Sequence, residues 1–198
     1  MQSTPDFDPA VAAKKLLREG RSGALATLMQ ASGDPYCSLV NVATATDGAP
    51  LLLISRLAVH TKNVLADPRV SLMIDERKAG DPLQGARIML MGTAAVTSDR
   101  DARRRYLERQ PEAQMFAGFA DFAFYRVTLK GAHLVAGFGR IVDLNLAGYF
   151  DRDRRRRRAR RRRARDCCPY EWRARRRGAA FCHQAARCSR RAMALRGL

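Results

Sequence analysis

The chain has 198 residues, of which 46% are hydrophobic, and its formal net charge is +18. This length allows one domain with a substantial core and leaves room for an appendage. No apolar run approaches the roughly 20 residues that a membrane helix needs, and residues 1–10 lack the basic region and apolar core of a secretory signal. The composition therefore argues against a membrane protein and predicts a cytoplasmic one.

The positive charge is concentrated at the end of the chain. Residues 1–150 hold 18 Lys+Arg against 15 Asp+Glu, whereas residues 151–198 hold 19 against 4. The body is close to neutral, so a nucleic-acid interface is not expected there. Cys37 is the one cysteine of the body, and the other four lie in the tail; a cytoplasmic chain should keep all five reduced.

The first element expected along the chain is a helix at residues 8–20. Asp8 can cap it, Pro9 suits its first position and Gly20 can end it. Its apolar face is expected to consist of Val11, Leu16 and Leu17.

Short strands are expected after this helix. Turn residues such as ASGDP at 31–35 and the pair Asp47–Gly48 separate them. The expected strands lie at residues 24–30, 36–46, 51–55, 70–74, 88–97, 122–129 and 133–138. Gly92 marks a bulge or bend in the fifth of these strands, and a helix capped by Ser98 or Asp99 is predicted over residues 101–109.

This pattern predicts a mainly β fold with flanking helices. Most connections are too short for the crossovers of a parallel sheet, so the strands should be antiparallel. Six or seven short strands at turn-marked spacing favour a closed or partly closed barrel over an open sheet. We assign this barrel to residues 1–142 and a basic tail to residues 143–198.

The segment 52–74 (LLISRLAVHTKNVLADPRVSLMI) carries the clearest functional signal. It reads as a strand, a polar loop, a short helix and a second strand. Unpaired backbone N–H groups and a partial positive charge make a helix start suitable for phosphate. Hydroxyl and cationic side chains converge on this start, namely Ser55, Arg56, His60, Thr61 and Lys62.

The order of elements resembles the FMN-binding split barrel of the pyridoxamine 5′-phosphate oxidase-like family, and most closely its HugZ-like haem-utilisation branch. The resemblance spans residues 8–142. The segments that carry it are SGALATL at 22–28, PYCSLVNVAT at 35–44, the stretch 48–76, RIMLMGTA at 87–94, and DFAFYRVTLKGAHLVAGFGR at 121–140.

The resemblance implies a homodimer with FMN in grooves between the subunits. Ser38 and Asn41 lie on the strand that lines the flavin in this family, and Ser55, His60, Thr61 and Lys62 lie where the phosphate is held. Arg87 falls where the family places a polar flavin contact, often supplied by the partner chain.

Two departures limit what the resemblance implies about activity. Classical members carry Arg and Lys on the strand where this chain has Ser38 and Ala43, and their C-terminal substrate-binding Arg and His pattern has no match. Oxidation of pyridoxamine phosphate is therefore not expected. The HugZ-like proteins continue into a His-bearing C-terminal domain, and residues 143–198 do not resemble it.

Several side chains also have structural interpretations. The loop cluster could be a capped, solvated helix start, and His60 could be a water-exposed residue in it. Asn41 could face outward, and Ser38 shares its face only if the strand bulges between them. Cys37 is expected to be buried, and Arg103–Arg105 to form a solvated helix face. No metal site is predicted, and no catalytic residue can be named.

The tail has three interpretations. Residues 151–166 contain 11 arginines, whose positive charges repel one another. Such a block could be an arm that binds nucleic acid or anionic lipid. A zinc site among its cysteines fits no standard spacing. The abrupt change in composition favours a frameshift that replaced the original C-terminal domain.

Two classes of function follow. The first is an FMN-binding oxidoreductase in which the flavin carries the redox chemistry, with haem binding or haem oxygenation as its main variant. The second is nucleic-acid binding through the arginine-rich tail. A barrel that has lost its cofactor and serves as a dimeric scaffold is a third possibility.

Overall fold

The computed structural model describes residues 7–76, 81–137 and 140–144. Its helices are α1 (Pro9–Glu19), α2 (Val59–Ala66) and α3 (Arg100–Arg109), with short 3-10 turns η1 (Pro82–Gln84) and η2 (Pro111–Met115). Its strands are β1 (Ser22–Leu28), β2 (Pro35–Asn41), β3 (Ala43–Thr44), β4 (Pro50–Ser55), β5 (Arg69–Asp75), β6 (Ala86–Val96), β7 (Phe122–Ala136) and β8 (Ile141–Leu144). The arginine-rich block and the tail cysteines lie outside the described residues, so the interpretations of the tail stay predictions.

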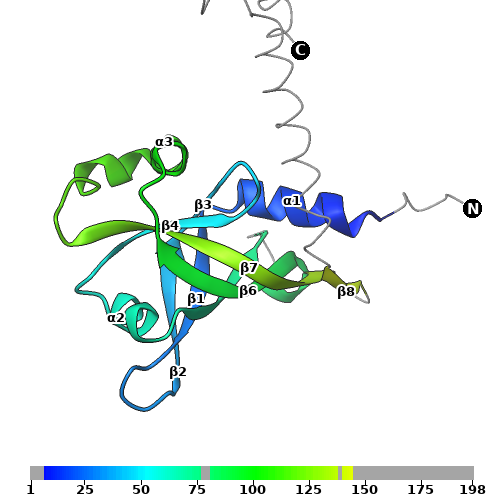
Figure 1. Ribbon diagram of the computed structural model, residues 1–198. Helices are drawn as coiled ribbons and strands as arrows, with labels where there is room; N and C mark the ends of the chain where they lie inside the picture. Colours follow the sequence, from blue (N-terminus) through cyan, green and yellow to red (C-terminus); the bar gives the residue numbers. More distant parts are fainter. Residues whose placement is uncertain (1–6, 77–80, 138–139, 145–198) are drawn as a thin grey trace, which may run out of the picture. The chain divides into compact units, whose positions relative to one another are not determined.

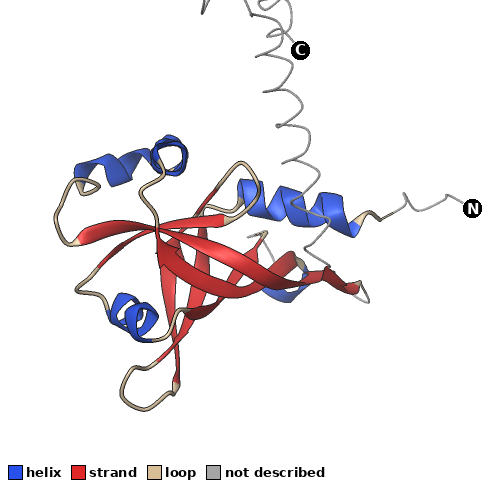
Figure 2. Ribbon diagram, viewed as in Figure 1, coloured by secondary structure: helices blue, strands red, loops and turns tan. Residues whose placement is uncertain are grey.

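All the strands belong to one antiparallel sheet that curls into a split barrel (Figure 2). Their order is β2-β1-β5-β6-β7-β4-β3, and β8 pairs with the end of β7. The predicted fold class is confirmed. Helices α1, α2 and α3 lie at separate places around the sheet (Figure 1).

Two predicted strand boundaries were wrong. The predicted strand 36–46 is broken at Val42, whose N–H donates to Arg21 O and whose carbonyl accepts from Gln110 Nε2. The chain thereby leaves β1 and pairs with β4 as β3. The predicted strands 122–129 and 133–138 are instead the single strand β7, because both halves pair with β6 across an irregularity.

Helix α1 begins as predicted. The carboxylate of Asp8 accepts hydrogen bonds from the N–H groups of Ala10 and Val11, at 2.8 and 3.2 Å. The predicted apolar face was wrong at one position, because Val11 is 62% exposed and Ala13 is buried instead, beside Leu16 and Leu17. Position 13 lies three and four residues before these leucines, which puts it on their side of the helix.

The core occupies two places. The larger cluster fills the inside of the curled sheet and includes Leu25, Leu52, Leu72, Ile88, Leu90 and Leu134, all nearly fully buried. The smaller cluster packs α3 and η2 on β4 and β7, where Tyr106 meets Phe124 edge-to-face at 5.6 Å. Burial raises the pKa of Tyr106 to about 12, so this phenol stays protonated.

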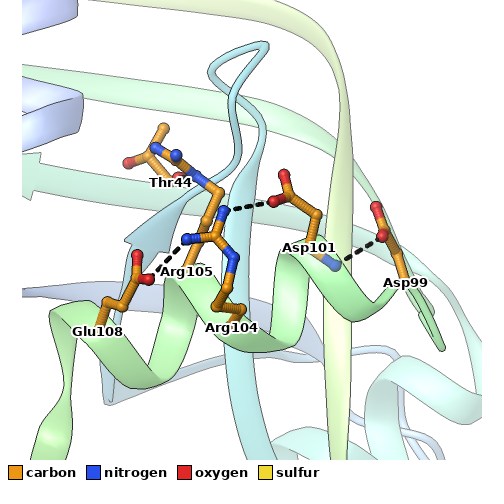
Figure 3. Close-up of polar contacts among 6 residues, drawn as sticks. All are labelled: Thr44, Asp99, Asp101, Arg104, Arg105 and Glu108. Carbon is orange, nitrogen blue, oxygen red and sulfur yellow. Dashed lines mark hydrogen bonds and ion pairs between the residues drawn. The ribbon is translucent and has the colours of Figure 1, made fainter. Parts of the chain in front are cut away.

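The arginines of α3 serve local structure (Figure 3). Asp99 caps the helix through the N–H of Asp101. The guanidinium of Arg104 bridges Asp101 and Glu108, each at 2.6 Å, and Nε of Arg105 donates to the carbonyl of Thr44. Arg104 is paired with carboxylates and Arg105 is bonded to a backbone carbonyl, so these two side chains are already engaged within the protein.

A bulge in the β6–β7 pair decides which side chains of β7 face outward. Gly92 pairs with Leu129 and Met91 with Gly131, so Lys130 is an extra residue. One inserted residue exchanges the two faces of a strand beyond it. The bulge therefore buries Leu134 and turns His133 away from the core. The bulge predicted at Gly92 is confirmed.

Candidate functional site

The predicted phosphate loop joins the end of β4 to the start of α2. Its first residue, Ser55, ends β4 opposite Phe122 of β7. Helix α2 is preceded by Ala58, which provides no capping side chain. The predicted strand-loop-helix order is therefore present, and the loop lies beside the beginning of β7.

The hydroxyl of Ser55 is already engaged within the protein. It donates to Oδ2 of Asp121 at 2.6 Å and accepts from the N–H of Leu57 at 3.1 Å. Asp121 also accepts the N–H of Arg56 at its carbonyl, at 2.7 Å. Asp121 thus organises the loop, and its carboxylate would repel a phosphate placed against Ser55.

Two further loop residues are poorly placed for a surface anion. Thr61 is fully buried, and its hydroxyl has no hydrogen-bond partner. His60 is half-buried, with Nδ1 at 3.0 Å from the hydroxyl of Ser38. Burial lowers the pKa of His60 below its usual 6.5, so the ring is neutral at pH 7 and provides no charge for a phosphate.

The cations of the loop remain accessible. Arg56 and Lys62 are both exposed, close to the first turn of α2. These two side chains fit an anionic group, whereas the hydroxyls predicted to help them do not. The phosphate of FMN is therefore matched only in part by this loop.

Asn41 and Arg87 lie apart from the loop. Asn41 is exposed at the end of β2, on the opposite face of that strand from Ser38, because β2 pairs with β1 without a bulge. Arg87 pairs with Val135 near the end of β7, whereas Ser55 pairs with the first residue of β7. Within one chain, Ser38 and the five loop residues therefore lie together, whereas Asn41 and Arg87 lie elsewhere on the sheet.

Asn41 and Arg87 border one face of the sheet, which the described helices leave uncovered. This face is here called the outer face. Cross-strand pairing aligns its side chains in two neighbouring rows. One row holds Leu39, Ala24, Met73, Met89, His133 and Asp143, and the other holds Cys37, Ala26, Ser71, Met91 and Gly131.

The outer face is apolar and accessible. Leu39 is 70% exposed, Met91 44% and Met73 39%. Cys37 is exposed as well, so its predicted burial was wrong. The reason is its position on β2, an edge strand whose alternate residues face away from the core. Soluble proteins rarely expose a contiguous apolar surface of this kind, and where they do it commonly marks a binding site.

The first of these rows ends in a polar pair, His133 and Asp143. Nδ1 of His133 lies 2.6 Å from Oδ1 of Asp143, between the directly paired strands β7 and β8. The His133 side chain is one-third exposed, and its cross-strand neighbour on β6 is Met89. Sequence reasoning missed the pair, because the side of β7 on which His133 lies depends on the bulge.

The family can now be assigned. The family model described as pyridoxamine 5′-phosphate oxidase matches residues 10–136. The chain belongs to this family. The match confirms the predicted resemblance to the split-barrel proteins of this family, and the haem-named relatives confirm its haem-utilisation branch.

Two relatives carry haem in their names. The chain is 38% identical over 137 residues to the chloroplastic heme oxygenase HOZ of Arabidopsis thaliana, covering 66% of this chain and 41% of that protein. A solved heme-binding protein from Mycobacterium smegmatis is 30% identical, with a TM-score of 0.69, over 75% of this chain and 62% of the other. This chain thus spans only about two fifths of the length of the Arabidopsis relative.

A more distant solved structure shares the fold alone. ChuZ of Campylobacter jejuni is 19% identical, with a TM-score of 0.61, over 73% of this chain and 61% of the other. Among the helices of residues 7–144 that the structure describes, none has the length and apolar character needed to cross a membrane. The cytoplasmic location remains a prediction.

Proposed function

We propose that this chain binds haem on the outer face of its sheet and acts in haem utilisation. The observation that carries the proposal is the exposed apolar surface of Leu39, Met73 and Met91 with His133 beside it. A porphyrin is flat and apolar, so it gains from contact with a flat apolar sheet. Thioether side chains adapt their shape to such a ligand.

The edge of the same face offers a cation. Arg87 lies two residues before Met89 on β6 and so projects from the same side of that strand. Its guanidinium Nη1 donates to the carbonyl of Leu83 at 2.9 Å, which leaves other donors for a carboxylate. Arg87 would hold a haem propionate. This proposal replaces the flavin contact predicted for Arg87 by a contact to haem.

The similar proteins support haem over FMN. The Arabidopsis and Mycobacterium relatives are both named for haem, and the hydroxyls of the loop are a poor match to phosphate. Bound haem would supply one-electron and oxygen chemistry. This chain's residues would bind and orient it and exclude water from one side.

A second copy of the chain would complete the site. An exposed apolar face on an antiparallel sheet commonly packs against another molecule, and two-fold dimers are the usual homo-oligomers. In a homodimer closed over the outer face, each chain's haem would lie between its own outer face and the partner subunit, one haem per chain. We therefore propose a homodimeric oxidoreductase-type protein.

The direct test is titration of the purified full-length chain with hemin, followed by absorption and by light scattering. We expect a saturable Soret shift and a mass equal to two chains. Met73→Lys places a charge on the outer face and should weaken haem binding at least tenfold. The matched control is Leu65→Lys, at a 62% exposed residue of α2 away from that face, which should leave binding unchanged. Equal effects from both variants would contradict the proposal.

FMN is the second candidate cofactor, favoured by the exposed cations Arg56 and Lys62 at the start of α2. In that case the purified protein should be yellow and release FMN on denaturation. Lys62→Ala should then reduce FMN retention, while Met73→Lys should change FMN retention only by disturbing the contact between the two subunits. A colourless protein that does not quench added FMN fluorescence would remove this candidate.

A further inference from the structure

A cavity of about 270 Å³ lies at one end of the barrel, beside helix α1. Part of its lining is Ala86 and Ala136, a cross-strand pair of β6 and β7. Along the two strands, this pair is the neighbour of the buried pair Ile88–Leu134 on the inner side of the sheet. The alanines continue the inner layer with much smaller side chains, so the interior stays hollow at this end. The cavity therefore opens on the opposite side of the sheet from the outer face.

Helix α1 runs beside the ends of β7 and β8 (Figure 1) and provides two charges to the cavity. Ala12, Lys15, Leu16 and Glu19 all line it, because residues three and four positions apart share one face of a helix. Opposite charges four residues apart on a helix commonly pair. Lys15 and Glu19 nevertheless form no ion pair with any residue that the structure describes. A cation and a carboxylate are thus both available to a ligand.

The turn after β7 brings a second cation to the cavity. Gly137 has a φ of +77°, a conformation that favours glycine, and the N–H of Ala136 donates to the carbonyl of Arg140 at 2.9 Å. These two features hold Arg140 beside the end of β7. Its Cζ lies 5.0 Å from the centre of the Phe7 ring. A guanidinium stacked on a ring keeps the N–H groups at its edge for other partners, and within the described part of the chain no side chain pairs with them.

The fourth charge belongs to Glu76, which directly follows β5. Oε2 of Glu76 accepts a hydrogen bond from the N–H of Ala86 at 3.2 Å, which fixes this carboxylate at the cavity wall. The lining thus contains two cations, Lys15 and Arg140, and two carboxylates, Glu19 and Glu76. A ligand of one charge would be repelled by two of these four groups, whereas a ligand with both charges can place each next to its opposite.

We propose that this cavity binds a free α-amino acid with an apolar side chain. The carboxylate of the ligand contacts Lys15 and Arg140, its ammonium group contacts Glu19 and Glu76, and its side chain packs on the alanine pair of β6 and β7. The volume fits a molecule of this size, because it is just below the roughly 300–1,000 Å³ of pockets that hold drug-sized ligands. The inference goes beyond haem binding, since the cavity and the outer face lie on opposite sides of the sheet.

The experiment is isothermal titration calorimetry of the full-length chain, without added hemin, against L-leucine and two analogues that each lack one charge. N-acetyl-L-leucine has no ammonium group, and L-leucine methyl ester has no carboxylate. We expect saturable binding of one L-leucine per chain and at least tenfold weaker binding of both analogues. Absence of a saturable signal at the solubility limit of L-leucine, or equal binding of the three compounds, would overturn the proposal.

Variants of the lining test which charges hold the ligand. Arg140→Gln and Glu19→Gln should each weaken L-leucine binding at least tenfold, because each removes a charge-assisted hydrogen bond. The matched controls are Lys130→Gln and Glu112→Gln, which remove one cation and one carboxylate from exposed positions outside the cavity. Ala136→Leu fills the cavity and should abolish binding while the circular dichroism spectrum stays that of the folded protein. Controls that weaken binding as much as the lining variants would contradict the proposal.

Discussion

Gly92→Ala tests the close approach of β6 and β7 at the bulge. A Cβ at position 92 would lie 2.2 Å from the carbonyl oxygen of Thr128 and 3.0 Å from its carbonyl carbon. These are backbone atoms of the paired strand, so neither can move as a flexible side chain could. Overpacking of this kind costs about 3 kcal/mol. At about 2–4 °C per kcal/mol, the melting temperature should fall by about 10 °C.

The assay is urea unfolding followed by circular dichroism, with thermal unfolding as a second measure. Gly131→Ala is the matched control on the partner strand, because its Cβ meets only the mobile terminal methyl of Met91 at 3.2 Å. We expect this control to cost less than about 1 kcal/mol. A Gly92→Ala protein as stable as Gly131→Ala would refute the close approach of the two strands.

Three further predictions concern α2. Thr61→Val removes a buried hydroxyl that has no partner and should stabilise the protein by up to about 1 kcal/mol; a loss of stability in urea would show that the hydroxyl is bonded. Asn63→Ala leaves the Thr27 hydroxyl and the Gln30 N–H without their partner and should cost about 2–3 kcal/mol by the same measurement. Because burial lowers the pKa of His60 below 6.5, the unfolded chain binds a proton more readily than the folded one. The stabilising effect of neutral His60 is therefore complete above pH 6.5 and decreases as the pH falls below it. Unfolding series from pH 8 to pH 5 should be flatter for His60→Gln, and parallel series would contradict the burial.

Local signals predicted the elements well. The cap at Asp8 and the strands at residues 51–55 and 70–74 depend on short-range chemistry and alternation, and the structure has each of them within one residue. The break at Val42 depends instead on two hydrogen bonds, one donated by Val42 N–H to the carbonyl of Arg21 and one donated by Gln110 Nε2 to the carbonyl of Val42, and both partners are distant in sequence. Local patterns contain no information about such contacts.

The candidate site was harder to predict for the same reason. Ser55 and Thr61 are suitable phosphate residues by type, but Asp121 engages the first and the core buries the second. Sequence patterns do not single out His133, because its face depends on one inserted residue, Lys130. A pattern of alternate apolar residues can show that a strand has two faces. It cannot show the position at which a bulge exchanges them.

The most direct test of the account is a competition between haem and FMN for the purified full-length chain. We predict that hemin saturates the protein at one haem per chain with a shifted Soret band. We also predict that the protein does not quench the fluorescence of added FMN and that FMN does not displace the haem. A protein that purifies with bound FMN and shows no Soret shift with hemin would contradict the central claim.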